Sequence, residues 1–114
     1  MEYFATFDTI GIRTIKDNNI IQIEFNKEND IIIINLRLIN KKEFNHRLII
    51  NRQYIINNIT SNFTVEMLYN ILVVLIKYDN FKFNLSVEHN SYIFEGTYIE
   101  PYDQGDEIHI KIEI

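Results

Sequence analysis

Cysteine is absent from this chain of 114 residues, and proline and glycine are scarce. Without thiols the chain cannot form disulfides or thiolate metal sites. One proline and three isolated glycines (Gly11, Gly96 and Gly105) exclude a glycine-rich phosphate loop and a flexible linker. The length and the missing linker predict a single α+β domain over residues 1–114.

Long hydrophobic runs are also missing. The densest apolar run, residues 71–76, is far shorter than the ~20 residues that span a bilayer. The residues that follow Met1 contain no basic stretch leading into an apolar one, so we expect no signal peptide. These features predict a cytoplasmic protein with no membrane segment.

Positive charge is deficient, and unevenly so. The net charge is −5; residues 58–114 carry three Lys/Arg against nine Asp/Glu, whereas residues 1–57 carry eight against seven. Residues 88–107 hold six acids and no Lys or Arg. This balance argues against nucleic-acid binding, which depends largely on basic side chains that contact phosphates.

Motifs for catalysis or metal binding are missing as well. The three serines lie outside any Gly-x-Ser-x-Gly pattern, and the three histidines are dispersed at His46, His89 and His109. The acidic stretch 100–107 lacks the spacing of a calcium-binding loop. We therefore expect no enzymatic activity, no metal and no cofactor.

Alternating and β-branched residues predict most of the secondary structure as strands. The run 31–34 is apolar on both faces, which favours a central strand that is covered on both sides. Gly96, in an aromatic strand, indicates a bulge or a close approach by another backbone, or simply relief from crowding by its aromatic neighbours. The expected strands are 3–8, 10–16, 20–26, 31–39, 81–88, 92–99 and 107–114, with the Asp17-Asn18-Asn19 turn between the second and third.

Residues 43–57 fit two patterns. Leu48, Ile50, Tyr54 and Ile56 follow a strand with a break, which favours a strand at about 46–52. A helix is the alternative, although it would place Asn51 and Arg52 on the apolar stripe.

One long helix is predicted over residues 64–78. Thr64 is a suitable N-cap, and Phe63 and Leu68 have the spacing of a hydrophobic staple. Glu66 and Lys77 complement the helix dipole in the first and last turns. The expected core stripe is Val65, Leu68, Leu72, Leu75 and Ile76, widened by Met67, Ile71 and Val74.

These elements predict an α+β fold with a mostly antiparallel sheet of about 7–8 strands and the one long helix packed on it. The order is four or five strands, the helix and three strands. Short connections favour antiparallel pairing, because parallel neighbours need long crossovers.

The acid-rich end of the chain is the expected binding site, because tyrosines beside carboxylates are typical of surfaces that bind basic proteins. The candidate residues are Tyr98, Glu100, Tyr102, Asp103, Asp106 and Glu107. The leading hypothesis is a small acidic protein-binding inhibitor, such as an immunity protein that neutralises a bacterial toxin or a phage-type inhibitor of a host nuclease. The alternatives are a structural or self-associating β-protein, with a homodimer as one form, and a small-molecule-binding or enzymatic α+β domain.

Overall fold

A computed structural model describes residues 2–6, 8–16, 18–39, 45–60, 62–86, 89, 91–99 and 107–114. The protein has the α+β fold that the sequence predicts, with antiparallel pairing throughout the described strands. The elements in chain order are β1 (Glu2–Ala5), β2 (Thr9–Lys16), β3 (Asn19–Glu28), β4 (Ile31–Leu38), β5 (Asn45–Ile50), α1 (Arg52–Asn58), α2 (Val65–Lys77), β6 (Phe81–Ser86), β7 (Ser91–Ile99) and β8 (Glu107–Glu113).

Strands β1 to β5 form a meander in which each strand pairs with the next. Asn18 and Asn29 adopt positive φ angles of 64° and 50° at the two hairpin turns around β3, which confirms the turn expected at residues 17–19. Asn adopts this left-handed conformation more readily than most residues. One face of this sheet is fully apolar at its centre, where Ile10, Phe25 and Ile34 stand side by side and are buried.

The long helix is confirmed. The Oγ1 atom of Thr64 accepts a hydrogen bond from the backbone N–H of Met67 at 3.1 Å, so Thr64 is the N-cap. Phe63 and Leu68 are both buried. The helix buries the predicted stripe together with Tyr69 and Ile71, whereas Met67 and Val74 remain exposed.

Two features differ from the sequence predictions. The strand expected at about 46–52 ends at Ile50, and a second helix, α1, follows it. Asn51 explains the change of structure, because its side chain accepts a hydrogen bond from the Tyr54 backbone N–H at 2.9 Å and caps the helix. Ile55 then anchors α1 in the core.

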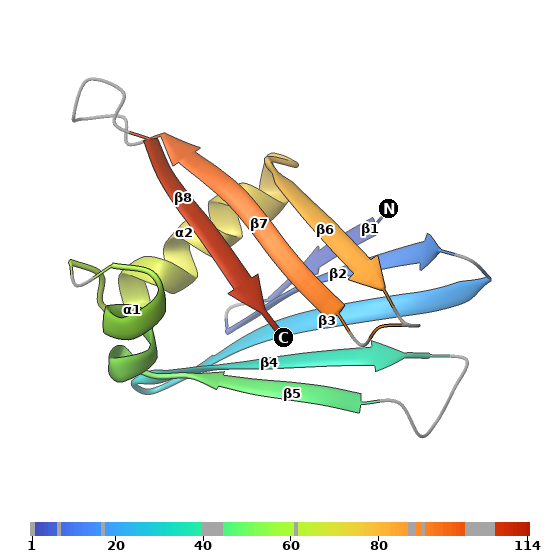
Figure 1. The fold of residues 1–114 in the computed structure, drawn as a ribbon, viewed down its shortest axis with the longest axis horizontal. Coiled ribbons are helices and arrows are strands. Elements are labelled where there is room, and N and C mark those ends of the chain that lie inside the picture. Colours follow the sequence, from blue (N-terminus) through green and yellow to red (C-terminus); the bar gives the residue numbers. More distant parts are fainter. Residues whose placement is uncertain are drawn as a thin grey trace.

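The second difference is that the strands form two sheets instead of one. Strands β6, β7 and β8 make a separate three-stranded sheet that lies across the five-stranded sheet, with α2 behind it (Figure 1). The rings of Phe25 in β3 and Phe94 in β7 pack edge to face, with their centroids 5.3 Å apart. This contact joins the two sheets. Helix α2 contacts strands of both sheets, and this explains why its apolar stripe is wide.

Gly96 of β7 lies against α2 and the turn that follows this helix. A Cβ atom at this position would lie 2.6 Å from Cδ1 of Leu75 and 3.2 Å from the backbone oxygen of Asn80. The close approach that was one reading of Gly96 is therefore confirmed.

Strand β4 lies inside its sheet, between β3 and β5. Its two-sided apolar pattern predicted a central strand, and this position is confirmed. Ile32 and Ile34 face the core; on the opposite face Ile33 is also buried and Ile31 is half-buried, although no described helix or strand lies over that face. Among the described residues, no helix is long and apolar enough to cross a membrane.

Candidate functional site

The β7–β8 hairpin sorts the residues of the acid-rich end onto two faces. Its register pairs Ile99 with Glu107, Thr97 with His109, and Glu95 with Lys111 on the face directed away from the five-stranded sheet. The alternate residues, among them Tyr92, Phe94 and Tyr98, face the core or its border.

The structure separates the two predicted site residues that it describes. Tyr98 is half-buried and packs against the core cluster, whereas Glu107 is exposed at the start of β8. Because Tyr98 pairs with Ile108, it lies on the opposite face of the hairpin from Glu107. The other predicted residues, Glu100, Tyr102, Asp103 and Asp106, lie outside the described residues.

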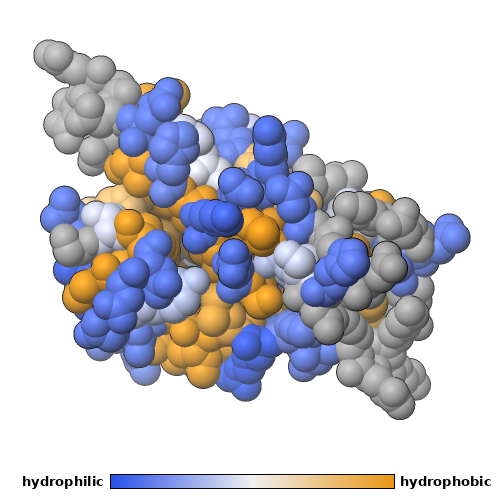
Figure 2. Space-filling model, viewed as in Figure 1, coloured by the Kyte–Doolittle hydropathy of each residue, from blue (hydrophilic) through white to orange (hydrophobic). Residues whose placement is uncertain are grey.

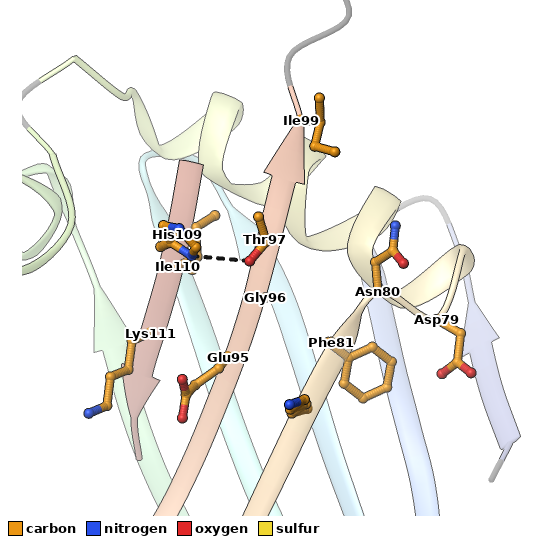
Figure 3. Close-up of a pocket in the computed structure, with 11 residues that line it drawn as sticks. Asp79, Asn80, Phe81, Glu95, Gly96, Thr97, Ile99, His109, Ile110 and Lys111 are labelled. Carbon is orange, nitrogen blue, oxygen red and sulfur yellow. Dashed lines mark hydrogen bonds between the residues drawn. The ribbon is translucent and has the colours of Figure 1, made fainter. Parts of the chain in front are cut away.

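A hollow of about 740 Å³ borders this hairpin and is open to solvent. It extends from the end of β7 across the three-stranded sheet to the turn that precedes β6 (Figure 3). Its lining comes from β6, β7, β8 and that turn: Asp79, Asn80, Phe81, Lys82, Glu95, Gly96, Thr97, Ile99, His109, Ile110 and Lys111.

A chain of polar groups runs from the lining of the hollow to Glu107. The Oγ1 atom of Thr97 and Nδ1 of His109 are 3.1 Å apart (Figure 3). Nε2 of His109 is 3.7 Å from Oε2 of Glu107. A hydroxyl, an imidazole and a carboxylate thus lie in sequence, as they do in hydrolase triads. Here, however, the imidazole and the carboxylate are both largely exposed, whereas the orienting acid of such a triad is buried.

Charge changes along the hairpin. At one end, Glu95 stands in register between Lys82 of β6 and Lys111 of β8. At the other end Glu107 has Ile99, and not a lysine, as its cross-strand neighbour. Figure 2 shows hydrophilic residues interspersed with hydrophobic ones on this side of the molecule. The face is therefore mixed in charge over its middle and acidic towards the β7–β8 connection.

Ile99 is the apolar residue that stands out at the acidic end. Its side chain is 59% exposed and projects at the end of β7 in Figure 3.

Comparison of the chain with protein-family models, with curated proteins and with solved structures found no match. The functional argument therefore rests on the geometry of the site. Within the segments that the structure describes, no group of three or more His, Asp or Glu side chains could hold a metal ion.

Sequence reasoning missed Thr97, Ile99 and His109 as members of this surface. The alternating pattern of each strand was visible in the sequence. It placed residues 95, 97 and 99 on one face of β7, and residues 107, 109 and 111 on one face of β8. The cross-strand register was needed to bring the two sets together, because a shift by one residue would exchange the faces.

Proposed function

We propose that this protein binds a basic protein partner and neutralises it, as an immunity protein neutralises a bacterial toxin or a phage-type inhibitor blocks a host nuclease. The proposed binding surface is the outer face of the β7–β8 hairpin together with the acidic connection between these strands. The observation that carries the proposal is the exposed apolar side chain of Ile99 directly opposite Glu107, beside a segment that is rich in carboxylates.

This combination supports binding for two reasons. Burying a large aliphatic side chain contributes about 1.5–3 kcal/mol, so Ile99 could act as an apolar anchor. Carboxylates around such an anchor attract a basic surface over a longer range and raise the rate of association. The anchor would then supply affinity, and the acids would supply attraction and orientation.

The openness of the hollow favours a protein over a small molecule. Small-molecule sites enclose most of the ligand surface and are lined mainly by apolar side chains. This hollow is open and is lined by charged residues such as Lys82, Glu95 and Lys111, which suit a protruding segment of a protein partner.

The experiment compares three tagged forms of the chain as baits in lysate from the source cells. The forms are the natural sequence, Ile99→Asp and the control Ile56→Asp; Ile56 is another exposed isoleucine, 43% exposed, located on α1. We expect basic proteins that bind the natural sequence and the control but are at least tenfold depleted with Ile99→Asp. A captured enzyme should also lose its activity when the natural sequence is added. Equal recovery with all three baits would refute the proposed surface.

We further propose that the protein acts in the cytoplasm and has no catalytic activity of its own. A cysteine-free chain is well suited to a reducing compartment. The hydroxyl–imidazole–carboxylate chain provides a direct test of the second point. Hydrolysis of a nuclease, protease or esterase substrate that disappears on substitution of His109 would show that the site is catalytic.

A further inference from the structure

The five-stranded sheet has a second face, directed away from α2 and the three-stranded sheet. None of the elements in the described part of the chain lies over it (Figure 1). The register identifies its side chains as Glu2, Phe4, Thr9, Gly11, Arg13, Ile15, Ile20, Gln22, Glu24, Asn26, Glu28, Ile31, Ile33, Asn35, Arg37, Asn45, Arg47 and Ile49. We call this surface the outer sheet face.

Isoleucines gather at both ends of the outer sheet face. At one end Ile15 pairs with Ile20, and the backbone N–H of Ile39 donates to the Ile20 carbonyl at 2.8 Å. At the other end the exposed Ile49 pairs with Ile33, which is buried. Ile15, Ile39 and Ile49 are 74%, 45% and 49% exposed. An open antiparallel sheet normally presents polar side chains to water, so these exposed isoleucines indicate a surface that becomes covered.

A hydrogen-bonded network lies between the two isoleucine clusters, centred on the middle strand β3. Arg13 donates from Nε and Nη2 to Oε1 of Gln22, at 3.2 and 2.7 Å. The amide of Gln22 donates to Oε1 of Glu24, which also accepts from Nη2 of Arg37 at 2.8 Å. Gln22 is buried although it lies on this open face. The network therefore fixes charged groups of both signs at the centre of the face.

The charge of the outer sheet face identifies the type of partner. Its three arginines are balanced by Glu2, Glu24 and Glu28, whereas the whole chain has a net charge of −5. A face that binds a strongly charged partner would carry the opposite charge. A neutral face that contains both signs can instead meet an identical face, with Arg of one copy near Glu of the other.

The arrangement of the face agrees with two-fold symmetry. Two sheets stack face to face when each presents apolar side chains to the other. Because isoleucines occupy both ends and the network occupies the middle, a two-fold axis through the centre and in the plane of the contact places isoleucines against isoleucines when it runs along, or perpendicular to, the line that joins the two clusters. Such an isologous contact is the commonest arrangement of homodimers.

The outer sheet face is smaller than the surface that a typical stable dimer buries. The five strands hold 36 residues, which at the usual strand rise and spacing cover about 600 Å². Stable interfaces bury about 800 Å² on each partner, and weak ones bury less. We propose that the outer sheet face binds a second copy of this chain, and that the resulting dimer is weak.

Analytical ultracentrifugation of the purified chain, from low to several hundred micromolar, tests this proposal. The natural sequence should pass from monomer to dimer over this range. The variant Ile15→Glu/Ile49→Glu should raise the dissociation constant at least tenfold, whereas the control Ile56→Glu, a matched isoleucine on α1, should leave it unchanged. Circular dichroism should show that all forms are folded.

The outcomes are distinguishable. A natural sequence that stays monomeric throughout the range, or a double variant that dimerises as well as the natural sequence, overturns the proposal. If the double variant fails to fold, the single variant Ile15→Glu decides the question in the same way, because a side chain this exposed contributes little to the core. Ile99 lies in the three-stranded sheet, so the variant Ile99→Asp should dimerise as well as the natural sequence.

Discussion

The close contact between α2 and β7 at Gly96 predicts how much stability the protein loses when this glycine is replaced by alanine. In Gly96→Ala the new methyl group would lie 2.6 Å from Cδ1 of Leu75, about 1 Å closer than carbon atoms pack. The Leu75 side chain can rotate away, but the backbone oxygen of Asn80, 3.2 Å from the same position, belongs to the chain that enters β6. Relief of the clash therefore requires movement of both.

The expected cost follows from two opposing effects. Overpacking of a core contact costs about 1–3 kcal/mol, and the loss of glycine freedom in the unfolded chain returns about 0.4–1 kcal/mol. We expect Gly96→Ala to destabilise the protein by about 1–2 kcal/mol. Leu75 is buried, so Leu75→Ala alone should cost about 2–5 kcal/mol.

The double variant Gly96→Ala/Leu75→Ala separates this contact from general loss of stability. Without the leucine methyls the clash disappears, and the alanine methyl at position 96 fills part of the cavity. The double variant should therefore be more stable than the sum of the single effects, by about 1–3 kcal/mol. Urea unfolding followed by far-UV circular dichroism measures all four forms. Gly96→Ala combined with Ile55→Ala, on α1 instead of α2, should be additive within about 0.5 kcal/mol. Additivity in the Leu75 cycle would refute the close approach.

Two further predictions concern stability. Burial raises the pKa of Tyr54, Tyr69 and Tyr92, and nearby Glu113 and Asp8 add to the effect at Tyr54 and Tyr69, respectively. Above about pH 10 the unfolded chain therefore loses these phenol protons before the folded chain does, so the free energy of unfolding should fall as the pH rises through the folded pKa values. Tyr69→Phe should make this decline shallower in urea titrations between neutral and alkaline pH; an unchanged slope would contradict the assignment. Thr64→Ala removes the cap of α2 and should cost about 1 kcal/mol, whereas Thr64→Ser should cost only a few tenths; equal losses would show that the hydroxyl does not act as a cap.

The local parts of the fold were predictable because their causes are local. Thr64, the apolar period of α2 and the alternation of β6 to β8 are all signals that nearby residues create. Helix α1 was foreseen only as the alternative for residues 43–57, because it is seven residues long and buries only Ile55, which leaves too short a period to detect. Its start is marked by the Asn51 side chain, which accepts a hydrogen bond from the Tyr54 backbone N–H.

The division into two sheets could not be predicted in the same way. It depends on contacts between residues distant in sequence, such as Phe25 with Phe94, and on the space that Gly96 leaves for α2. Alternation showed that β7 and β8 each have two faces, but it did not reveal the register between them. For this reason Tyr98 and Glu107 were grouped as one site, although they lie on opposite faces of the hairpin.

The central claim is that the acid-rich end of the β7–β8 hairpin binds a basic protein. Titration calorimetry with the captured partner, at increasing salt, tests it most directly on the natural sequence and on Glu100→Lys/Asp103→Lys/Asp106→Lys. We predict that the triple variant keeps its melting temperature, because charge substitutions away from a core usually change stability by about 0.5 kcal/mol or less. Its affinity should fall at least tenfold, which is about 1.4 kcal/mol, and the affinity of the natural sequence should decline as salt rises. A triple variant that binds with full affinity, independently of salt, would contradict the claim.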